Sequence, residues 1–180
     1  MIFRQLFDSQ SWTYTYLLAE RRGGEALIID PVLDGVPRYL RLIRELDLQL
    51  VMAIDTHIHA DHVTGMGRLR QATWCAAAMG EQAPAECLSL RFREGETLKV
   101  DGIALKALYT PGHTDDSYSL VLPDSVFTGD TLLIGGTGRT DFQNGDPGAQ
   151  YDSLFGKLLT LPDETVVYPA HDYEGRTSST

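Results

Sequence analysis

The chain has 180 residues, of which 43% are hydrophobic and 22% charged, and this ordinary globular composition is enough for one well-buried core. Its formal net charge of −10 disfavours nucleic-acid binding and attachment to an anionic membrane surface, since both depend on basic side chains. No apolar run approaches the roughly 18 residues that a membrane-spanning helix needs. We therefore expect a single domain over residues 1–180.

The expected elements alternate between strands and helices, which suggests sheets covered by helices. In chain order, the apolar runs predict strands at 13–20 and 25–30, a helix at 36–46, strands at 50–55, 96–100, 103–109, 117–122 and 125–130, a helix at 150–161 and a strand at 165–172. The first helix is amphipathic, and the second places Tyr151, Leu154, Phe155, Leu158 and Leu159 on one face. Asp101-Gly102 predicts a hairpin between the strands at 96–100 and 103–109.

The two cysteines, Cys75 and Cys87, are twelve positions apart and form no C-x-x-C motif. Neither a disulfide framework nor a zinc ribbon is therefore indicated. We expect both to be buried, inert thiols in a reducing compartment.

Seven side chains that can bind a metal follow predicted strands. They are His57, His59, Asp61 and His62 in "DTHIHADH", His113 in "TPGH", Asp130 in "FTGD" and His171 in "PAHDY". Strand ends bring side chains from distant segments to a common point, so we expect these residues to form one site.

The histidine cluster within residues 57–62 predicts metal binding. Three imidazoles this close would repel one another if protonated and would lose hydrogen-bond partners if buried neutral, and a cation removes both costs. His57 and His59 point the same way in an extended segment and can share one metal, whereas Asp61 and His62 can turn toward a neighbouring metal. The histidines and the aspartate from the other strand ends would be structural residues on their own. Beside this cluster, they are predicted to be ligands.

The four motifs "THIHADH", "TPGH", "FTGD" and "PAHDY", in this order and spacing, resemble the metallo-β-lactamase fold. The resemblance implies an α/β (α+β) architecture, an αββα sandwich of two sheets flanked by helices, with the metal site at one edge. The longer segments "FTGDTLLIGGTGRTDFQNGD" and "VVYPAHDYEGRTSST" are similar to glutathione-dependent persulfide dioxygenases, also called sulfur dioxygenases. Glyoxalase II, a thioester hydrolase, is the nearest relative with a different reaction.

The two families use the same side chains differently. In a glyoxalase II-like hydrolase with two Zn²⁺ ions, Asp130 would bridge the metals, one of which would be bound by His57, His59 and His113 and the other by Asp61, His62 and His171. In a persulfide dioxygenase, one Fe²⁺ ion per chain would be bound by His57, His113 and Asp130, with open positions for the persulfide and O₂. The side chains that then surround the iron and orient its ligands would be His59, Asp61, His62 and His171.

The dioxygenase resemblance implies that glutathione persulfide is oxidised by O₂ and water to sulfite and glutathione. Arg139 and Tyr173 match positions that the family uses around the glutathione moiety, and Arg176 is a third candidate. Tyr173 and His171 are also expected to act in catalysis. An arginine can clamp a carboxylate with two parallel hydrogen bonds. The structural alternatives are pairing of Arg139 with Asp141 and a packing role for Tyr173.

The resemblance also bears on partners and location. It is compatible with a homodimer and with a rhodanese or other sulfurtransferase as a partner or fused domain. A metal-binding docking partner in a persulfide relay, without turnover, is the non-enzymatic alternative. The leaderless start fits a bacterial cytoplasm, although a mature mitochondrial matrix protein would look similar. Because the family normally continues beyond "YEGRTSST", we expect a truncated or short member.

Overall fold

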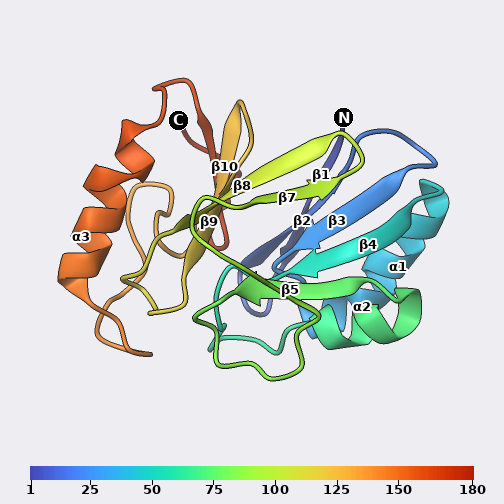
Figure 1. Cartoon of the computed structure of the whole chain (residues 1–180), viewed down its shortest axis with the longest axis horizontal. Helices are drawn as coiled ribbons and strands as arrows, with labels where there is room; N and C mark the ends of the chain where they lie inside the picture. The colour runs from blue at the N-terminus through green and yellow to red at the C-terminus, as the bar shows by residue number, and fades with distance from the viewer.

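The structure, a computed structural model, describes all residues from 1 to 180, and two β-sheets form its centre (Figure 1). The first sheet follows chain order and contains β1 (Ile2–Asp8), β2 (Thr13–Ala19), β3 (Glu25–Ile29), β4 (Gln49–Ile54), β5 (Ala76–Gly80) and β6 (Leu90–Phe92). The second sheet has the order β11 (Val166–Pro169), β10 (Ser125–Gly129), β9 (Tyr118–Val121), β8 (Ile103–Tyr109) and β7 (Thr97–Val100).

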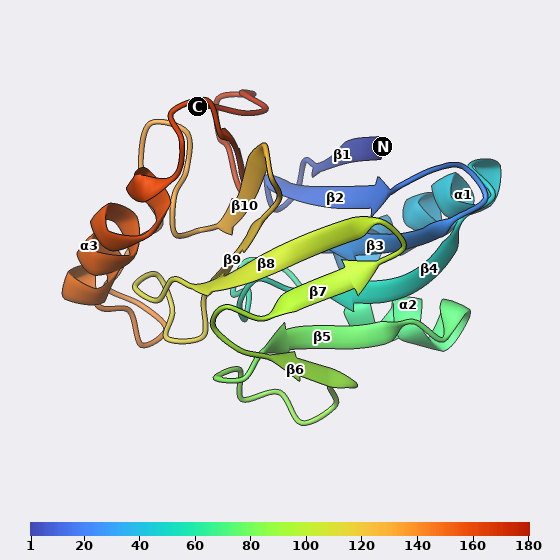
Figure 2. The same cartoon turned by 45° about the horizontal axis from the view of Figure 1, so that its top comes forward.

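Three helices flank the sheets. Figures 1 and 2 show α1 (Val36–Glu45) and α2 (Met66–Thr73) along the first sheet, and α3 (Pro147–Gly156) on the far side of the molecule beside the second sheet. Two short 3₁₀ turns, η1 (Leu33–Gly35) and η2 (Leu158–Thr160), precede α1 and follow α3. This arrangement confirms the predicted metallo-β-lactamase architecture of two sheets flanked by helices.

Strand β2 contributes side chains to two hydrophobic cores. Its side chains alternate between the two faces of the sheet, as strand geometry requires. Tyr16 and Leu18 pack into the core between the sheets, whereas Leu17 and Ala19 pack into the core that the first sheet forms with α1 and α2. Every residue of β2 is buried, because both faces of the sheet are covered.

Several local predictions are confirmed. Helix α1 buries Val36, Tyr39 and Ile43, which recur at helical spacing. The hairpin of β7 and β8 turns through Asp101, whose φ of 47° lies in the left-handed region that Asp tolerates. The prediction did not include α2, β5 or β6.

The prediction for residues 150–161 is wrong in two respects. The helix begins at Pro147, where the Asp146 carboxylate caps it, and ends at Gly156, so Leu158 lies in a separate 3₁₀ turn. Its buried residues are Gln150 and Ser153, which donate hydrogen bonds to main-chain oxygens of neighbouring loops. Of the five apolar side chains, Leu158 is buried and Leu154 half-buried, whereas Tyr151, Phe155 and Leu159 are exposed.

The cysteine prediction is half correct. Cys75 is buried, and burial raises the pKa of its thiol, whereas Cys87 is exposed. Both cysteines are free. The apolar sequence around Cys75 continues into β5, but Cys87 lies in the loop between β5 and β6, where no local pattern sets burial.

The strands end where the predicted ligands begin. His57 follows β4 of the first sheet, and His113, Asp130 and His171 follow β8, β10 and β11 of the second. The site is therefore assembled at one edge of the sandwich from both sheets. No helix of the protein is long and apolar enough to cross a membrane.

Candidate metal centre

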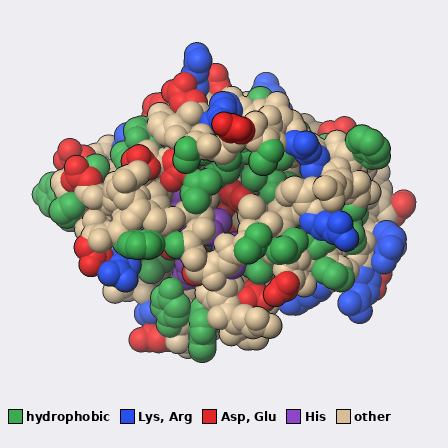
Figure 3. Space-filling model, turned by 90° about the horizontal axis from the view of Figure 1, so that it is seen from below, with side chains coloured by type: hydrophobic (Ala, Val, Ile, Leu, Met, Phe, Trp, Pro, Cys, Tyr) green, Lys and Arg blue, Asp and Glu red, His purple; other side chains and the backbone are tan.

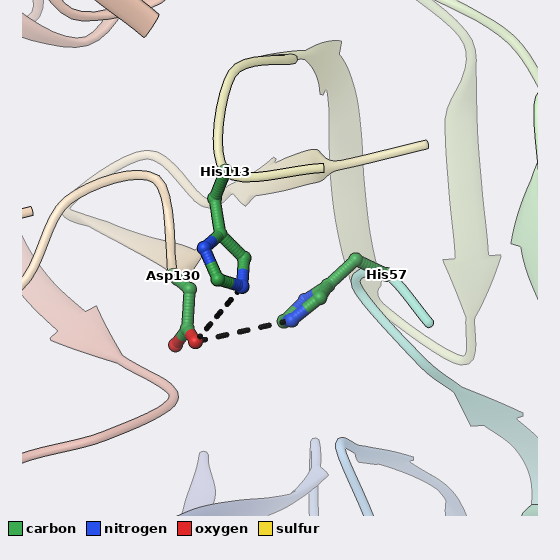
Figure 4. Close-up of side chains that lie close together, drawn as sticks. All are labelled: His57, His113 and Asp130. Atoms are coloured by element: carbon green, nitrogen blue, oxygen red, sulfur yellow. Dashed lines mark ion pairs between the residues drawn. The ribbon is translucent and has the colours of Figure 1, made fainter. Parts of the chain in front are cut away.

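Three side chains from three different strand ends converge on one point (Figure 4). The Nε2 atoms of His113 and His57 lie 3.4 Å and 3.9 Å from the same oxygen, Oδ2 of Asp130. One ligand atom from each residue lies within 4.8 Å of the others. Two imidazoles and one carboxylate that can bind a metal from one side form the donor set known as a facial triad.

A chain of hydrogen bonds sets the orientation of His57. Asp30 accepts hydrogen bonds from the main chain and the hydroxyl of Thr56, at 2.7 Å and about 3.0 Å respectively. Because the only hydroxyl hydrogen of Thr56 goes to Asp30, its oxygen accepts from Nδ1 of His57, 3.0 Å away. The free lone pair of His57 is then on Nε2, toward Asp130.

His113 is oriented by the loop that follows Asp130. Its Nδ1 donates to the main-chain oxygen of Arg139 at 2.7 Å, which leaves the Nε2 lone pair free. The close approach depends on Gly138, because a Cβ there would meet the main-chain oxygen of Asp130 and lie only 2.7 Å from Nδ1 of His113. The loop at Gly138 therefore lies directly against the His113 ring.

Burial and charge both favour a cation at this triad. Burial lowers the pKa of His57, and the neighbouring imidazoles, His59 first, lower it further, so the ring is neutral and can bind a metal. Oδ1 of Asp130 is buried without a hydrogen-bond partner. Such an orphaned carboxylate oxygen is costly in a folded protein unless an ion or water satisfies it. The residues therefore fit a metal ion.

The other members of the histidine cluster form a second group, His59, Asp61 and His62. Nε2 of His59 lies 3.1 Å from Asp30, and Nδ1 of His62 lies 2.8 Å from Asp61. Although burial alone would lower it, the pKa of His59 is raised to about 9 by the charge and hydrogen bond of Asp30. This group consists of imidazoles already paired with carboxylates, although Nδ1 of His59 and Nε2 of His62 remain without partners.

His171 lies between the two groups. Its Nε2 is 3.6 Å from Asp61 and 3.7 Å from Asp130, and its Nδ1 donates to the main-chain oxygen of Trp12 at 3.1 Å. The ring of Tyr173 lies parallel to that of His171, with 6.0 Å between centroids. Burial raises the pKa of Tyr173, and the charges of Asp130 and Asp61 raise it further, so its hydroxyl stays protonated and can donate.

A pocket of about 430 Å³ opens onto the triad. Figure 3 shows histidines on the floor of a hollow with hydrophobic side chains around its mouth. The pocket is lined by Ala60, Asp61, His113, Asp130, Leu133, Thr137, Gly138, Arg139, Phe142, Gln143, His171 and Tyr173. Two predicted substrate contacts, Arg139 and Tyr173, are therefore part of the wall.

The two predicted arginines already have protein partners. Arg139 forms a bidentate pair with Asp141, with N–O distances of 2.7 Å and 2.9 Å, as the structural alternative anticipated. Arg176 pairs with Asp172 and donates to the main-chain oxygen of Ile134, and it is not part of the pocket wall. Arg139 remains accessible because its side chain is two-thirds exposed (66%).

Several residues of the site were not identified from the sequence. Asp30 stands at a strand exit like the predicted ligands, in "LIIDP", so its position was a usable signal. Thr56 and Gly138 stand beside predicted ligands, but their contacts depend on the folded loops. The main-chain oxygen of Trp12, 159 positions away in the chain, accepts a hydrogen bond from His171. No sequence pattern predicts such a contact.

A family comparison agrees with this geometry. The family model described as the metallo-beta-lactamase superfamily matches residues 13–88 and 89–171. The chain belongs to this superfamily. The matched ranges contain all seven predicted ligands, so the metal-binding motifs and the sandwich are part of one family pattern.

Three members of the superfamily are informative. The chain is 44% identical to the mitochondrial persulfide dioxygenase ETHE1 of Homo sapiens over 183 aligned residues, which cover 100% of the chain and 72% of that protein. The crystal structure of ETHE1 from Myxococcus xanthus superposes with a TM-score of 0.97 at 52% identity, covering 99% of the chain and 79% of that structure. A hydroxyacylglutathione hydrolase of Rhodopseudomonas palustris is 35% identical, covering 94% of the chain and 66% of the relative.

Proposed function

We propose that the protein is a persulfide dioxygenase that oxidises glutathione persulfide with O₂ and water at a single Fe²⁺ ion. The observation that carries the proposal is the convergence of His57, His113 and Asp130. Identity of 44% to a persulfide dioxygenase across the whole chain supports the reaction class. The lower identity of 35% to the hydrolase makes that relative the more distant of the two.

The reaction requires an electron acceptor and releases protons. Glutathione persulfide, O₂ and water give glutathione, sulfite and two protons, and the two sulfur atoms together lose four electrons, which O₂ accepts. When bound by His57, His113 and Asp130, iron would supply the redox chemistry that joins persulfide and O₂, which zinc lacks. Iron is therefore the cofactor that we propose, and two Zn²⁺ ions are the alternative.

Residues around the triad have separate tasks. Thr56 and the main-chain oxygen of Arg139 keep the two imidazoles in the tautomer that offers Nε2. His171 donates from Nδ1, so its Nε2 can accept a proton that the reaction releases. The hydroxyl of Tyr173, on the pocket wall, can donate to the substrate.

We assign the carboxylate end of the substrate to Arg139. Its guanidinium stands on the pocket wall, and a carboxylate can accept two parallel hydrogen bonds from it. The guanidinium of Arg139 donates to Asp141, so a substrate carboxylate has to displace the exposed side chain of Asp141. A substrate role for Arg176 stays a prediction, because its guanidinium is bound to Asp172 and Ile134 outside the pocket wall.

A thioester hydrolase is the second candidate, and the second ligand group favours it. Nδ1 of His59 and Nε2 of His62 are buried without partners, as they would be if they bound the two metal ions. Against it, the charge and hydrogen bond of Asp30 raise the pKa of His59, so a metal at its Nδ1 would have to displace a proton. A protonated imidazole cannot bind a metal until it releases that proton.

The decisive experiment compares two substrates with and without O₂. Iron-loaded protein given glutathione persulfide should consume O₂ and release sulfite, and this should stop when O₂ is removed. A hydrolase would instead cleave S-lactoylglutathione at the same rate with or without O₂, because its nucleophile is a metal-bound hydroxide. Robust hydrolysis without any O₂ uptake on the persulfide would contradict the proposal.

We further propose that residues 1–180 act as one catalytic domain, because both sheets contribute to the site. The free cysteines fit a reducing compartment. A bacterial cytoplasm, a mitochondrial matrix, a homodimer and a rhodanese or other sulfurtransferase partner all stay predictions.

A further inference from the structure

An aromatic wall, defined as Phe7, Trp12 and Tyr173, extends outward from the metal pocket. The ring of Trp12 lies 6.1 Å from that of Tyr173 and 5.9 Å from that of Phe7. All three are exposed, at 36% for Phe7, 44% for Trp12 and 62% for Tyr173. Because Tyr173 also lines the pocket, the wall is continuous with the site.

Trp12, the central residue of the wall, lies in the turn between β1 and β2. The Asp8 carboxylate accepts hydrogen bonds from the main chain of Gln10 and from the main chain and hydroxyl of Ser11. Trp12 has a φ of 59°, a left-handed conformation that is uncommon for a bulky side chain. Its carbonyl is bound to His171, so the turn is attached to the floor of the site. The main chain of this exposed tryptophan is therefore fixed beside the site.

The surroundings of the wall suit a positive charge. The cation–π contacts within the chain are Arg139 over Phe142 and Lys157 over Tyr109, so Trp12 and Tyr173 have no lysine or arginine over their rings. Carboxylates stand close by, because Asp61 lines the same pocket as Tyr173 and Asp8 accepts hydrogen bonds in the turn that precedes Trp12. Aromatic faces attract ammonium groups, most strongly at tryptophan.

We propose that Trp12 is a specificity residue that binds the ammonium group of the persulfide carrier against the aromatic wall. The substrate class rests on the proposed function. In glutathione, the ammonium belongs to the γ-glutamyl group, and the carrier also has carboxylates for Arg139. Trp12 therefore selects thiol carriers that bear a primary ammonium over carriers of the same shape without one.

Tryptophan fluorescence tests the assignment without turnover. The chain has two tryptophans, so Trp74→Phe leaves Trp12 as the sole reporter. Glutathione should change its emission saturably. Glutaryl-cysteinylglycine, which lacks only the ammonium, should bind roughly threefold to tenfold more weakly. The matched Trp12→Phe variant, which reports from Trp74, should show no emission change, because Trp74 is 92% exposed and outside the wall and the pocket lining.

Kinetics with iron-loaded protein supply a second readout. Trp12→Gly removes the ring at a φ that glycine accepts, and it should raise KM for glutathione persulfide about threefold to tenfold with kcat and iron content retained. It should leave KM unchanged for the glutaryl analogue of the persulfide. Trp12→Phe keeps an aromatic face, so its KM for glutathione persulfide should lie between those of the wild-type protein and Trp12→Gly.

Two results would overturn the inference. One is equal affinity of the Trp12-only protein for the two thiols, and the other is an equal rise in KM for the two persulfides in Trp12→Gly. The second would make Trp12 an apolar contact for the carrier without a preference for charge. If the wild-type protein takes up no O₂, the proposed reaction fails, and the fluorescence comparison still decides whether Trp12 recognises an ammonium.

Discussion

The two ligand groups contain the same residue types and differ in what each imidazole contacts. In the triad of His57, His113 and Asp130, each ring gives its Nδ1 hydrogen to an uncharged oxygen. In the second group, His59 and His62 contact carboxylates directly. The carboxylate of Asp30 raises the pKa of His59 and favours its imidazolium, whereas burial lowers the pKa of His57 and favours the neutral form that binds a metal. The neighbours therefore decide which imidazoles are ready to be ligands.

The largest expected effect is at Asp130, which belongs only to the triad. Asp130→Ala should abolish iron binding and reduce O₂ uptake to background, because both imidazoles lose the carboxylate that completes the donor set. Metal analysis of protein purified from iron-supplemented cells measures this directly. Wild-type protein should contain one iron per chain, and two zinc ions per active chain would contradict the distinction between the groups.

Gly138→Ala should have the next largest effect. The new Cβ would meet the main-chain oxygen of Asp130 and the ring of His113, so we expect iron affinity and activity to fall about tenfold to a hundredfold. Gly136→Ala is the matched control, since no atom lies within 4 Å of its Cβ position. Equal behaviour of the two variants would show that the loop does not hold His113 in place.

Arg139→Ala separates the two roles of one residue. Its main-chain oxygen, which orients His113, is retained, so iron content should stay normal. Loss of the guanidinium should raise KM about tenfold to a hundredfold for a persulfide carrier with a carboxylate. Arg93→Ala, which removes a similarly exposed arginine paired with Glu81, is the control. An unchanged KM would show that the Arg139 side chain pairs with Asp141 but does not bind the substrate.

The smallest effect is expected in the second group. Asp61→Asn keeps an oxygen that can accept from His62, and it should retain one iron per chain with about a tenfold loss of activity or less. Iron content and O₂ uptake are measured together. Loss of metal comparable to that of Asp130→Ala would make Asp61 a ligand and would favour the dinuclear site.

Local features of the fold could be predicted from the sequence. Alternating apolar residues predict β2, the helical spacing of Val36, Tyr39 and Ile43 predicts α1, and Asp-Gly predicts the hairpin turn, because each pattern reflects contacts between near neighbours in the chain. The identities of the seven candidate ligands were also readable, since they follow strands that end at a common edge. These are the features that a short window of sequence contains.

The division of those ligands into two groups depends on contacts between distant segments. The tautomers of His57 and His113 depend on Thr56 and on the carbonyl of Arg139, and the pKa of His59 depends on Asp30, 29 positions away. The exposure of apolar side chains on α3 and the hydrogen bond between Trp12 and His171 also depend on how distant segments pack. A hydrogen bond between distant segments depends on how two sheets pack, and that geometry is absent from any local pattern of residue types.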